Sequence, residues 1–310
     1  MRNLITISDY YYLEKGLTLY ESLKSSQSKN SFKLFYICLD EKTFKVINSI
    51  KNKNIEAINI NDLENDNFEL KNIRNLPPSK EAISNGNAQN RDPQYIQFCW
   101  ALSSYACYYC IHRLNLKNVY YLDADLYFYE DLSMFDEEIS NKSVGIVRHR
   151  IDYLPSSGEF NVGIVYFKNS YVGKKCCLWW KKQMSTLPEN NPYFPWYGQC
   201  GDQKYLELFP LIFGDEVCIV DKKVGHLAPW NVTFHKYKND KIIWNGIEQD
   251  LLYFHFSHFK IIGDSYKTSY NNEWIWGVPE KTDIFVKNKY DDYYIKTKEN
   301  IKKYRLKNEK

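Results

Sequence analysis

NLITISDYYYLEKGLTLYESLKS, residues 3–25, is the stretch that decides the fold. Its first six residues form an apolar run of strand length, and the rest places Leu17, Tyr20 and Leu23 roughly on one face of a helix. The alternation continues with a strand at 33–39 (KLFYICL), a helix at 41–51 and a strand at 55–60. This spacing indicates an α/β fold with a doubly wound mixed, mostly parallel sheet.

The remaining sequence extends the same pattern. Residues 65–91 are polar and hold Pro77-Pro78, so we expect loops there. Asp92-Pro93 supplies an N-cap and a first-turn proline for a long helix to about Arg113. Further strands are expected at 119–122, 143–148, 163–167, 217–220, 230–234 and 251–256, and helices at 171–187 and 202–209. No linker is evident, so we expect a single domain over 1–286, whose halves (about 1–130 and 131–286) share one sheet, followed by a basic tail, 287–310.

Charge and composition exclude several classes of protein. The net charge is only +3, and no basic patch indicates nucleic-acid binding. The tail holds nine Lys or Arg residues against four acidic ones and could lie on an anionic membrane surface, but we favour a solvated helix or a disordered end. Residues 94–111 are uncharged, yet their polar residues favour a buried helix over a membrane span. We expect no signal peptide, and a cytoplasmic protein that could be peripheral on the inner face of the membrane.

The eight cysteines follow no disulfide framework. Most of them lie in apolar sequence, which favours reduced thiols in the core. Cys107-x-x-Cys110 falls inside the expected long helix and has no second ligand pair nearby, so we do not expect zinc there.

An apolar strand ends in two carboxylates in the run VYYLDADLYF at 119–128. In an extended backbone alternate side chains share a face, so Asp123 and Asp125 can point the same way. Paired carboxylates suit a divalent cation such as Mn²⁺ or Mg²⁺, which would neutralise a departing diphosphate. The run therefore suggests an enzyme that acts on a sugar nucleotide; the alternative is a turn with solvated acids.

Four other groups of polar residues belong with this pair. Asp9 and Tyr12 follow the first strand, where ligands of doubly wound sheets bind, although Asp9 could simply cap the next helix and the tyrosines could pack. Asn161 offers a donor and an acceptor, and Gly163 allows close backbone approach. The third group is Asp202 with Gln203, where Asp202 could instead be an N-cap. The fourth group is His255, His258 and Lys260. In it, His255 could complete a metal site and Lys260 could hold a diphosphate.

The order of these motifs resembles that of GT-A-fold, nucleotide-sugar-dependent glycosyltransferases, especially the family-eight type that includes glycogenin and bacterial lipopolysaccharide galactosyltransferases. The chain is also similar to a related bacterial group with an N-terminal D-x-x-Y-L-x-x-G-L-x-L-Y-x-S-L pattern, which stands here at residues 9–23. The resemblance runs from about residue 3 to residue 263. At its end the chain departs from the H-x-x-G-x-x-K-P-W segment of family eight, because His258 replaces Gly, Lys260 comes one position early and no Pro-Trp follows.

The resemblance implies roles for these residues. Asp9 and Tyr12 would contact the nucleoside in a nucleotide-binding half, and Asp123, Asp125 and His255 would hold the metal, with Asp123 also touching the ribose. Asn161 would face the donor sugar or the acceptor, Asp202 and Gln203 would flank the reacting sugar, and Gly163 and Lys260 would contact the donor. The segment Pro229-Trp230-Asn231 would shape the acceptor side.

The function expected from this resemblance is sugar transfer. A Mn²⁺- or Mg²⁺-dependent glycosyltransferase would move a sugar, with retention, from a UDP-sugar to a carbohydrate or lipid-linked saccharide acceptor. A sugar-phosphate nucleotidyltransferase is the alternative enzyme, but it would need a Gly-rich phosphate loop where this chain has Ser8-Asp9-Tyr10. A non-catalytic carbohydrate-binding relative is the other alternative.

Overall fold

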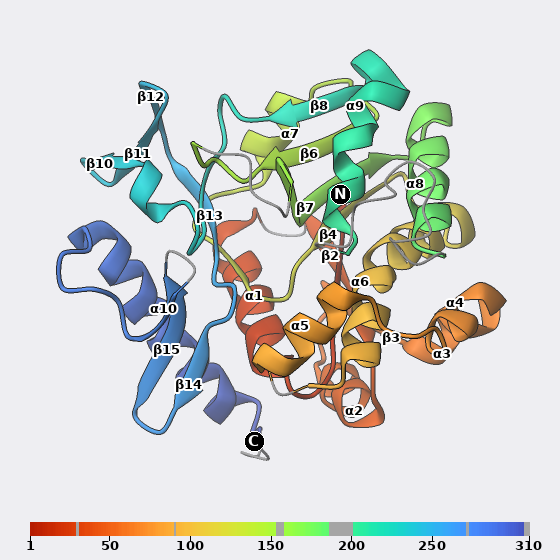
Figure 1. Cartoon of the computed structure of the whole chain (residues 1–310), viewed down its shortest axis with the longest axis horizontal. Coiled ribbons are helices and arrows are strands. Elements are labelled where there is room, and N and C mark those ends of the chain that lie inside the picture. The colour runs from red at the N-terminus through yellow and green to blue at the C-terminus, as the bar shows by residue number, and fades with distance from the viewer. Residues whose placement is uncertain (29–30, 90, 153–157, 186–200, 271–272, 307–310) are drawn as a thin grey trace.

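A seven-stranded sheet forms the centre of the molecule, in the order β3-β2-β1-β4-β7-β6-β8 (Figure 1). The computed structural model describes residues 1–28, 31–89, 91–152, 158–185, 201–270 and 273–306. The strands are β1 (Arg2–Ser8), β2 (Phe32–Cys38), β3 (Ile55–Asn59), β4 (Asn118–Leu122), β6 (Val144–Arg148), β7 (Phe160–Lys168) and β8 (Val217–Val220). β7 is antiparallel to both of its neighbours and the other adjacent pairs are parallel, which confirms the predicted mixed sheet.

Helices cover both faces of this sheet, as predicted for a doubly wound fold. Along β4, Val119 and Tyr121 pack into one core cluster, and Tyr120 and Leu122 pack into the other. The first cluster includes α6 (Pro93–Tyr108) and α8 (Tyr171–Gln183), and the second includes α1 (Leu13–Ser26), α2 (Glu41–Ser49) and α7 (Ser133–Ile139). A buried strand such as β4 therefore contributes side chains to the cores on both faces of the sheet, because successive side chains point to opposite faces.

The polar segment at 65–91 is helical, so the prediction of loops there was wrong. It holds the end of α3 (Ile60–Asp66), α4 (Phe68–Ile73) and α5 (Lys80–Gln89). Leu63, Leu70 and Ile73 are buried in the core cluster that includes α6, while most of the polar residues between them are at least partly exposed. One apolar residue per turn is enough for a short helix that packs on a large core.

The other boundaries follow the sequence closely, with one exception. Asp92 caps α6 as expected, because its carboxylate accepts the Gln94 N–H at 3.1 Å. α6 is buried, and it continues as a π-helical turn, Tyr109–Arg113. The strand predicted at 230–234 is instead a turn with a 3₁₀ segment, Val232–Phe234, because the Asn231 side chain accepts the Ala228 N–H at 2.8 Å and closes the backbone.

The C-terminal part adds three small sheets beside the central one. Their strands are β5 (Leu126–Phe128), β13 (Leu251–His255) and β9 (Gly225–Leu227) in the first, β10 (Lys236–Lys238), β11 (Lys241–Trp244) and β12 (Ile247–Gln249) in the second, and β14 (Lys260–Ile262), β15 (Ser265–Tyr270) and β16 (Glu273–Trp276) in the third. β5 follows β4 after a short turn, so the chain passes directly from the central sheet into the first small sheet. Leu208–Phe213 (α9) follows a 3₁₀ segment at Gln203–Glu207, close to the helix predicted at 202–209.

Residues 287–303 of the basic tail lie within α10 (Ile284–Lys303), and 307–310 lie outside the described residues. Phe285, Val286, Tyr290 and Tyr293 on one face of this helix are buried in the C-terminal core. Asn300 donates to the Thr18 hydroxyl of α1 at 3.2 Å, which ties the helix to the N-terminal half. In the described part of the chain, no helix combines the length and the apolar character needed to cross a membrane.

Candidate active site

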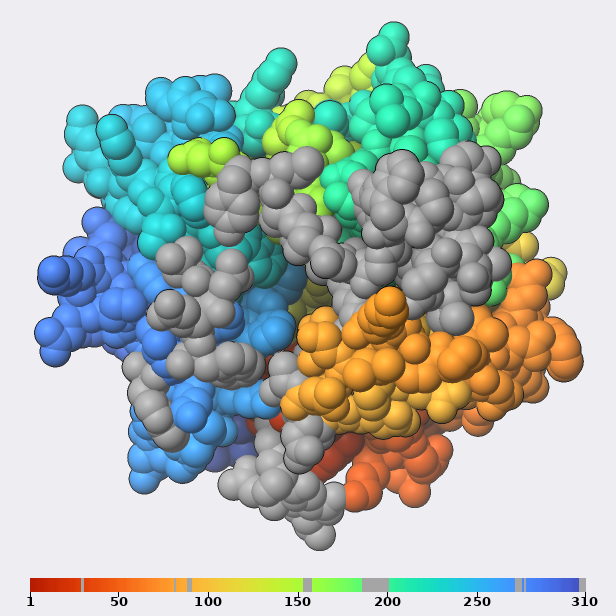
Figure 2. Space-filling view, in the orientation of Figure 1, coloured from red at the N-terminus to blue at the C-terminus, as the bar shows by residue number. Residues whose placement is uncertain are grey.

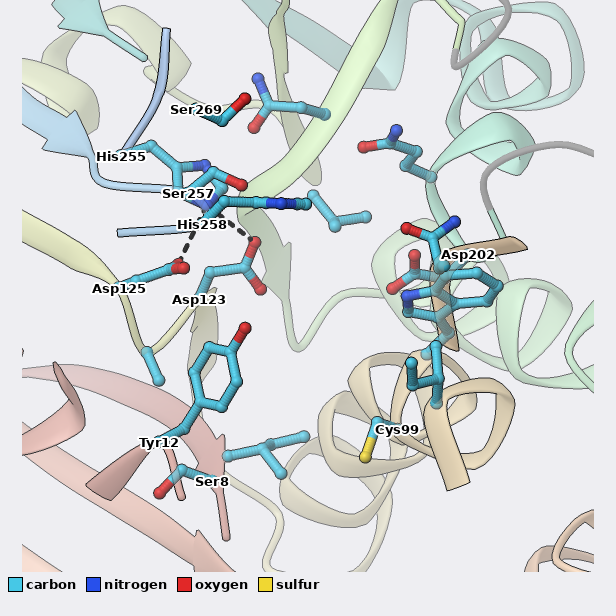
Figure 3. A pocket seen from close by; sticks show the side chains of 18 of the residues that line it. Ser8, Tyr12, Cys99, Asp123, Asp125, Asp202, His255, Ser257, His258 and Ser269 are labelled. Carbon is cyan, nitrogen blue, oxygen red and sulfur yellow. Dashed lines mark ion pairs between the residues drawn. The ribbon is translucent and has the colours of Figure 1, made fainter. Parts of the chain in front are cut away.

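A cavity of about 560 Å³ opens at the carboxyl edge of the central sheet. Figure 2 shows the surface hollowed between α5 and the C-terminal part. β1, β4 and β6 run in the same direction, so the segments that follow them meet at this edge. These segments bring Asp9, Asp123 and His149 to the cavity wall, and Figure 3 shows Asp202 on the opposite side from Asp123 and His255.

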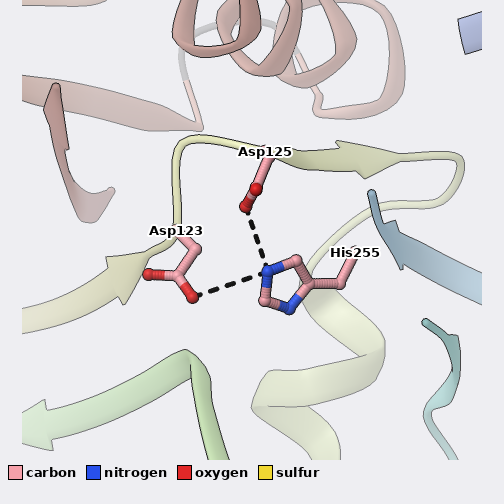
Figure 4. Close-up of side chains that lie close together, drawn as sticks. All are labelled: Asp123, Asp125 and His255. Carbon is pink, nitrogen blue, oxygen red and sulfur yellow. Dashed lines mark ion pairs between the residues drawn. The ribbon is translucent and has the colours of Figure 1, made fainter. Parts of the chain in front are cut away.

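The two acids and His255 converge because of one strand pairing. Asp123 and Asp125 lie in the turn between β4 and β5, and His255 is the last residue of β13. β13 pairs antiparallel with β5 so that His255 stands opposite Leu126, and the Phe256 N–H donates to the Asp125 carbonyl at 2.8 Å. Residues 130 positions apart in sequence thus share one corner of the cavity (Figure 4).

The three side chains form a compact set that could hold a metal ion. His255 Nε2 lies 3.0 Å from Asp125 Oδ1 and 3.6 Å from Asp123 Oδ2, and the three ligand atoms lie within 4.8 Å of one another. Two carboxylate oxygens with one imidazole nitrogen fit Mn²⁺ or Mg²⁺. The expectation that the acids lie in an extended strand was wrong: β4 ends at Leu122, and the turn itself makes the carboxylates converge.

Burial and mutual charge set the protonation of this cluster. Burial raises the pKa of Asp123, and the nearby Asp125 carboxylate raises it further. Burial acts in the same direction on Asp125, but His255 outweighs it and holds the pKa of Asp125 low. Burial lowers the pKa of His255, but the two carboxylates more than offset this and raise it above its usual value. The carboxylates thus favour a positive charge at His255 Nε2, the place that a metal ion would take.

A buried lysine, Lys15 of α1, supports the same cluster. Its Nζ lies 3.8 Å from Asp125 Oδ2 and 4.2 Å from the centre of the Tyr12 ring. Burial lowers the pKa of Lys15, while Asp125 opposes that shift. This residue was missed, because a lysine within a helix carries no local mark of burial.

Gly163 and Asn161 lie behind the metal ligands. The Asn161 side-chain oxygen accepts the Gly163 N–H at 2.8 Å, and the Gly163 carbonyl accepts the Asp123 N–H at 3.1 Å. A Cβ on Gly163 would lie only 3.1 Å from His255 Nδ1. The glycine is therefore favoured by two close approaches, that of Asn161 Oδ1, 2.7 Å from the same Cβ position, and that of the imidazole.

At one end of the cavity Asp9 is the centre of a polar cluster. Its carboxylate accepts the Tyr12 N–H at 3.0 Å and the Tyr95 hydroxyl at 3.1 Å, and it forms an ion pair with Arg91. The Arg91 guanidinium lies 5.0 to 5.5 Å from the ring centres of Tyr11, Tyr12 and Tyr95. Asp9 thus holds the turn before α1, and its predicted ligand role is compatible with this because each carboxylate oxygen can accept more than one hydrogen bond. Arg91 was missed because it lies in the segment predicted as loops.

At the other end of the cavity a hydrogen bond from α6 holds the Asp202 side chain, which does not act as a helix cap. The Ser103 hydroxyl donates to Asp202 Oδ2 at 2.7 Å, and the Trp180 indole donates to the Asp202 carbonyl at 3.1 Å. The Asp202 side chain makes no capping hydrogen bond to the 3₁₀ segment that follows, so the N-cap alternative was wrong. Its carboxylate and the adjacent Gln203 line the cavity.

Most of the predicted site residues line this one cavity. They are Asp9, Tyr12, Asp123, Asp125, Asn161, Asp202, Gln203 and His255. Within the part of the chain that the structure describes, Gly163 and Lys260 are not among the lining residues. His258 is, with a φ of 62°, which suits the position where the resembling family has Gly.

Comparisons with known proteins agree with this architecture. No protein-family model matches the chain. The Bacillus subtilis (strain 168) protein YfnF is 26% identical over 264 residues, which cover 81% of this chain and 79% of YfnF. The structure of mouse xyloside xylosyltransferase 1 in its apo form matches with a TM-score of 0.53 and 14% identity over 83% of this chain and 98% of that one. Galactosyltransferase LgtC, in complex with donor and acceptor sugar analogs, matches with a TM-score of 0.53 and 13% identity over 94% of both chains.

These likenesses establish the fold. The central mixed sheet and the helices on both of its faces belong to one architecture, which covers nearly the whole of the xylosyltransferase and galactosyltransferase chains. This chain therefore has the GT-A glycosyltransferase fold that its order of motifs predicted.

Proposed function

We propose that this chain is a metal-dependent glycosyltransferase that moves a sugar from a nucleotide diphosphate donor, a UDP-sugar, to a saccharide or lipid-linked saccharide acceptor. The observation that carries the proposal is the convergence of Asp123, Asp125 and His255 in one corner of the cavity. The fold shared with two sugar transferases supports the same reaction class.

The three converging side chains would hold Mn²⁺ or Mg²⁺. When bound, the cation would neutralise the charge that develops on the departing diphosphate. Asp125 and His255 are almost fully buried, so the protein fixes these ligands before the donor arrives. The buried ammonium of Lys15 beside Asp125 adds a fixed positive charge to this corner.

The Asp9 end of the cavity would bind the nucleoside. Uracil has an N–H donor between two carbonyl acceptors, and Asp9 with Arg91 offers a carboxylate acceptor beside a guanidinium donor. The Tyr12 ring lines the same region and could pack against the base. This pairing of an acceptor with a donor supports a uridine nucleotide.

The Asp202 end would receive the transferred sugar. Asn161, Asp202 and Gln203 line this part of the cavity and can hydrogen-bond to sugar hydroxyls. We propose retention of configuration, as the resemblance to family eight implies, with Asp202 or Gln203 beside the reacting carbon. Ser103 holds the Asp202 carboxylate there in one orientation.

Hydrolysis of UDP-sugars without an acceptor tests the proposal. Wild-type protein should release UDP from a UDP-sugar only when Mn²⁺ or Mg²⁺ is present. Asp125→Ala should lower this rate on the order of 100-fold or more, since the loss of outer-shell partners alone weakens metal sites 10- to 100-fold. Asp264→Ala, at an exposed turn between β14 and β15, is the matched control.

Three results would contradict parts of the proposal. Unchanged hydrolysis by Asp125→Ala would remove the metal assignment. Binding of sugars with no metal-dependent release of UDP from any donor would favour the non-catalytic relative. Release of diphosphate from UTP and a sugar phosphate would identify a nucleotidyltransferase instead.

A further inference from the structure

A histidine outside the metal cluster lines the same cavity. His149 follows directly on β6, at the sheet edge that also carries Asp9 and Asp123. Its residue is only 5% exposed, so it is part of the interior and not a surface histidine. The sequence analysis did not single it out, although ligand-binding groups gather at the carboxyl ends of such strands.

Hydrogen bonding fixes the protonation of the His149 ring. Nδ1 lies 2.7 Å from the Gly158 carbonyl oxygen. A carbonyl only accepts, so Nδ1 carries the proton, and Nε2 of the neutral ring presents a lone pair. Burial lowers the pKa of His149 to about 4, which keeps the ring neutral near pH 7. Among the described residues, none donates a hydrogen bond to Nε2.

Trp230 and Asn231 hold His149 in this orientation. The Trp230 indole N–H and the Asn231 amide both donate to the His149 carbonyl, at 3.2 Å and 3.0 Å. The Trp230 ring packs edge-on against the His149 ring at 5.4 Å and against His255 at 5.2 Å. Trp230 therefore packs against both His149 and His255, and it also lines the cavity.

We propose that His149 Nε2 accepts a hydrogen bond from a hydroxyl of the acceptor saccharide, beside an apolar wall made by Trp230 and Ile151. The inference rests on the proposed function, because it assumes that the cavity holds sugars. A sugar ring offers hydroxyl donors at its rim and C–H groups on its faces, and a lone pair beside an indole matches both.

A hydroxyl of the donor sugar has the same chemistry, but we assign the acceptor. Three polar residues, Asn161, Asp202 and Gln203, already line the region proposed for the donor sugar. His149 is not one of the three side chains that converge on the proposed metal position. Trp230, which packs against His149, belongs to the segment expected to shape the acceptor side.

Two substitutions separate the two ring nitrogens of His149. In His149→Asn the amide reaches the position of Nδ1, so it can still donate to the Gly158 carbonyl, but nothing replaces Nε2. In His149→Gln the amide oxygen can take the position of Nε2, while the bond to Gly158 is lost. His112→Asn, at a half-buried histidine whose Nε2 contacts the Lys174 carbonyl outside the cavity, is the control.

The assay is calorimetric titration of the protein loaded with UDP and Mn²⁺. The probes are the 4-nitrophenyl glycosides of glucose, galactose and xylose, and thermal unfolding checks that each variant is folded. We expect at least one glycoside to bind wild-type protein. His149→Asn should raise its Kd about tenfold, the effect of one lost hydrogen bond, whereas His149→Gln should stay within about threefold of wild type.

The contrary outcomes point to different faults. Failure of wild-type protein to bind UDP with Mn²⁺ would sink the proposed function and this inference with it. Binding of UDP without binding of any glycoside would overturn the acceptor subsite alone. A larger loss in Gln than in Asn would mean that His149 acts only through Gly158. An unchanged glycoside Kd with a raised KM for the UDP-sugar would assign the hydroxyl to the donor.

Discussion

Replacing Gly163 with Ala should damage the proposed metal site without removing a ligand. The added Cβ would lie 2.7 Å from Asn161 Oδ1 and 3.1 Å from His255 Nδ1. Both distances are shorter than ordinary van der Waals contact, so the imidazole has to move by several tenths of an ångström. Gly163 lies within β7 and its φ is not in the left-handed region, so the backbone itself accepts Ala.

The size of the effect follows from how closely His255 is held. The Trp230 ring packs against it at 5.2 Å, so the imidazole cannot simply rotate away from the new methyl group. Metal-ligand distances tolerate deviations of only about 0.2 Å. We expect the Kd for Mn²⁺ to rise 10- to 100-fold, about 1.4 to 2.8 kcal/mol, as when an outer-shell partner of a metal site is lost.

Calorimetric titration with Mn²⁺ measures this effect, and Gly145→Ala in the adjacent strand β6 is the matched control. A Cβ on Gly145 would lie 3.3 Å from Ile139 and Tyr166, outside the cavity, so that variant tests general damage to the sheet. A folded Gly163→Ala protein whose Mn²⁺ affinity is within twofold of wild type would refute the placement of His255 as a ligand. An equal loss in Gly145→Ala would show that the effect is not specific to the site.

Two further predictions concern the nucleoside end and a distant histidine. Asp9→Asn should raise the Kd for UDP with Mn²⁺ about tenfold, because an amide can turn a donor toward the base N–H; an unchanged Kd in calorimetry would place the base elsewhere. Burial lowers the pKa of His235 to about 4 from the usual 6.5, so the stability linked to its neutral ring is present above pH 6.5 and is lost as the pH falls toward 4. Between pH 7 and pH 5 the free energy of unfolding, measured in urea, should fall by about 2 kcal/mol less in His235→Asn than in wild type, because other buried histidines such as His149 contribute equally to both; equal losses would contradict this cause.

The fold could be predicted because its signals are local. Strand-length apolar runs alternate with helical patterns through residue 60, and the predicted bounds of these strands and helices lie close to those in the structure. The prediction was wrong at 65–91, where short helices bury only one apolar residue per turn, too few to stand out from polar sequence. It was also wrong at 230–234, where a side-chain hydrogen bond of Asn231, and not the apolar pattern, decides the backbone.

The candidate site was predictable only in part, because its geometry depends on strand pairing. Asp123 and Asp125 carry a local mark, two acids after an apolar strand. Nothing local shows that β13 pairs with β5, the contact that brings His255 to the acids; the resemblance to a family supplied that residue. Lys15 and His149 were missed for the same reason, since their places depend on which helix and strand lie beside the cavity.

The charges at this corner explain how a cation and a diphosphate can depend on each other for binding. Without a metal ion, Lys15 and a proton on His255 would balance the carboxylates of Asp123 and Asp125. A divalent cation that replaces the imidazole proton would leave the buried corner with one excess positive charge, and a diphosphate alone would leave it negative. Uncompensated charge in a buried site is costly, and the excess charge of the cation would offset part of the charge of the diphosphate. The proposed diphosphate would therefore bind more favourably with the cation than without it, as an enzyme that stabilises a leaving diphosphate requires.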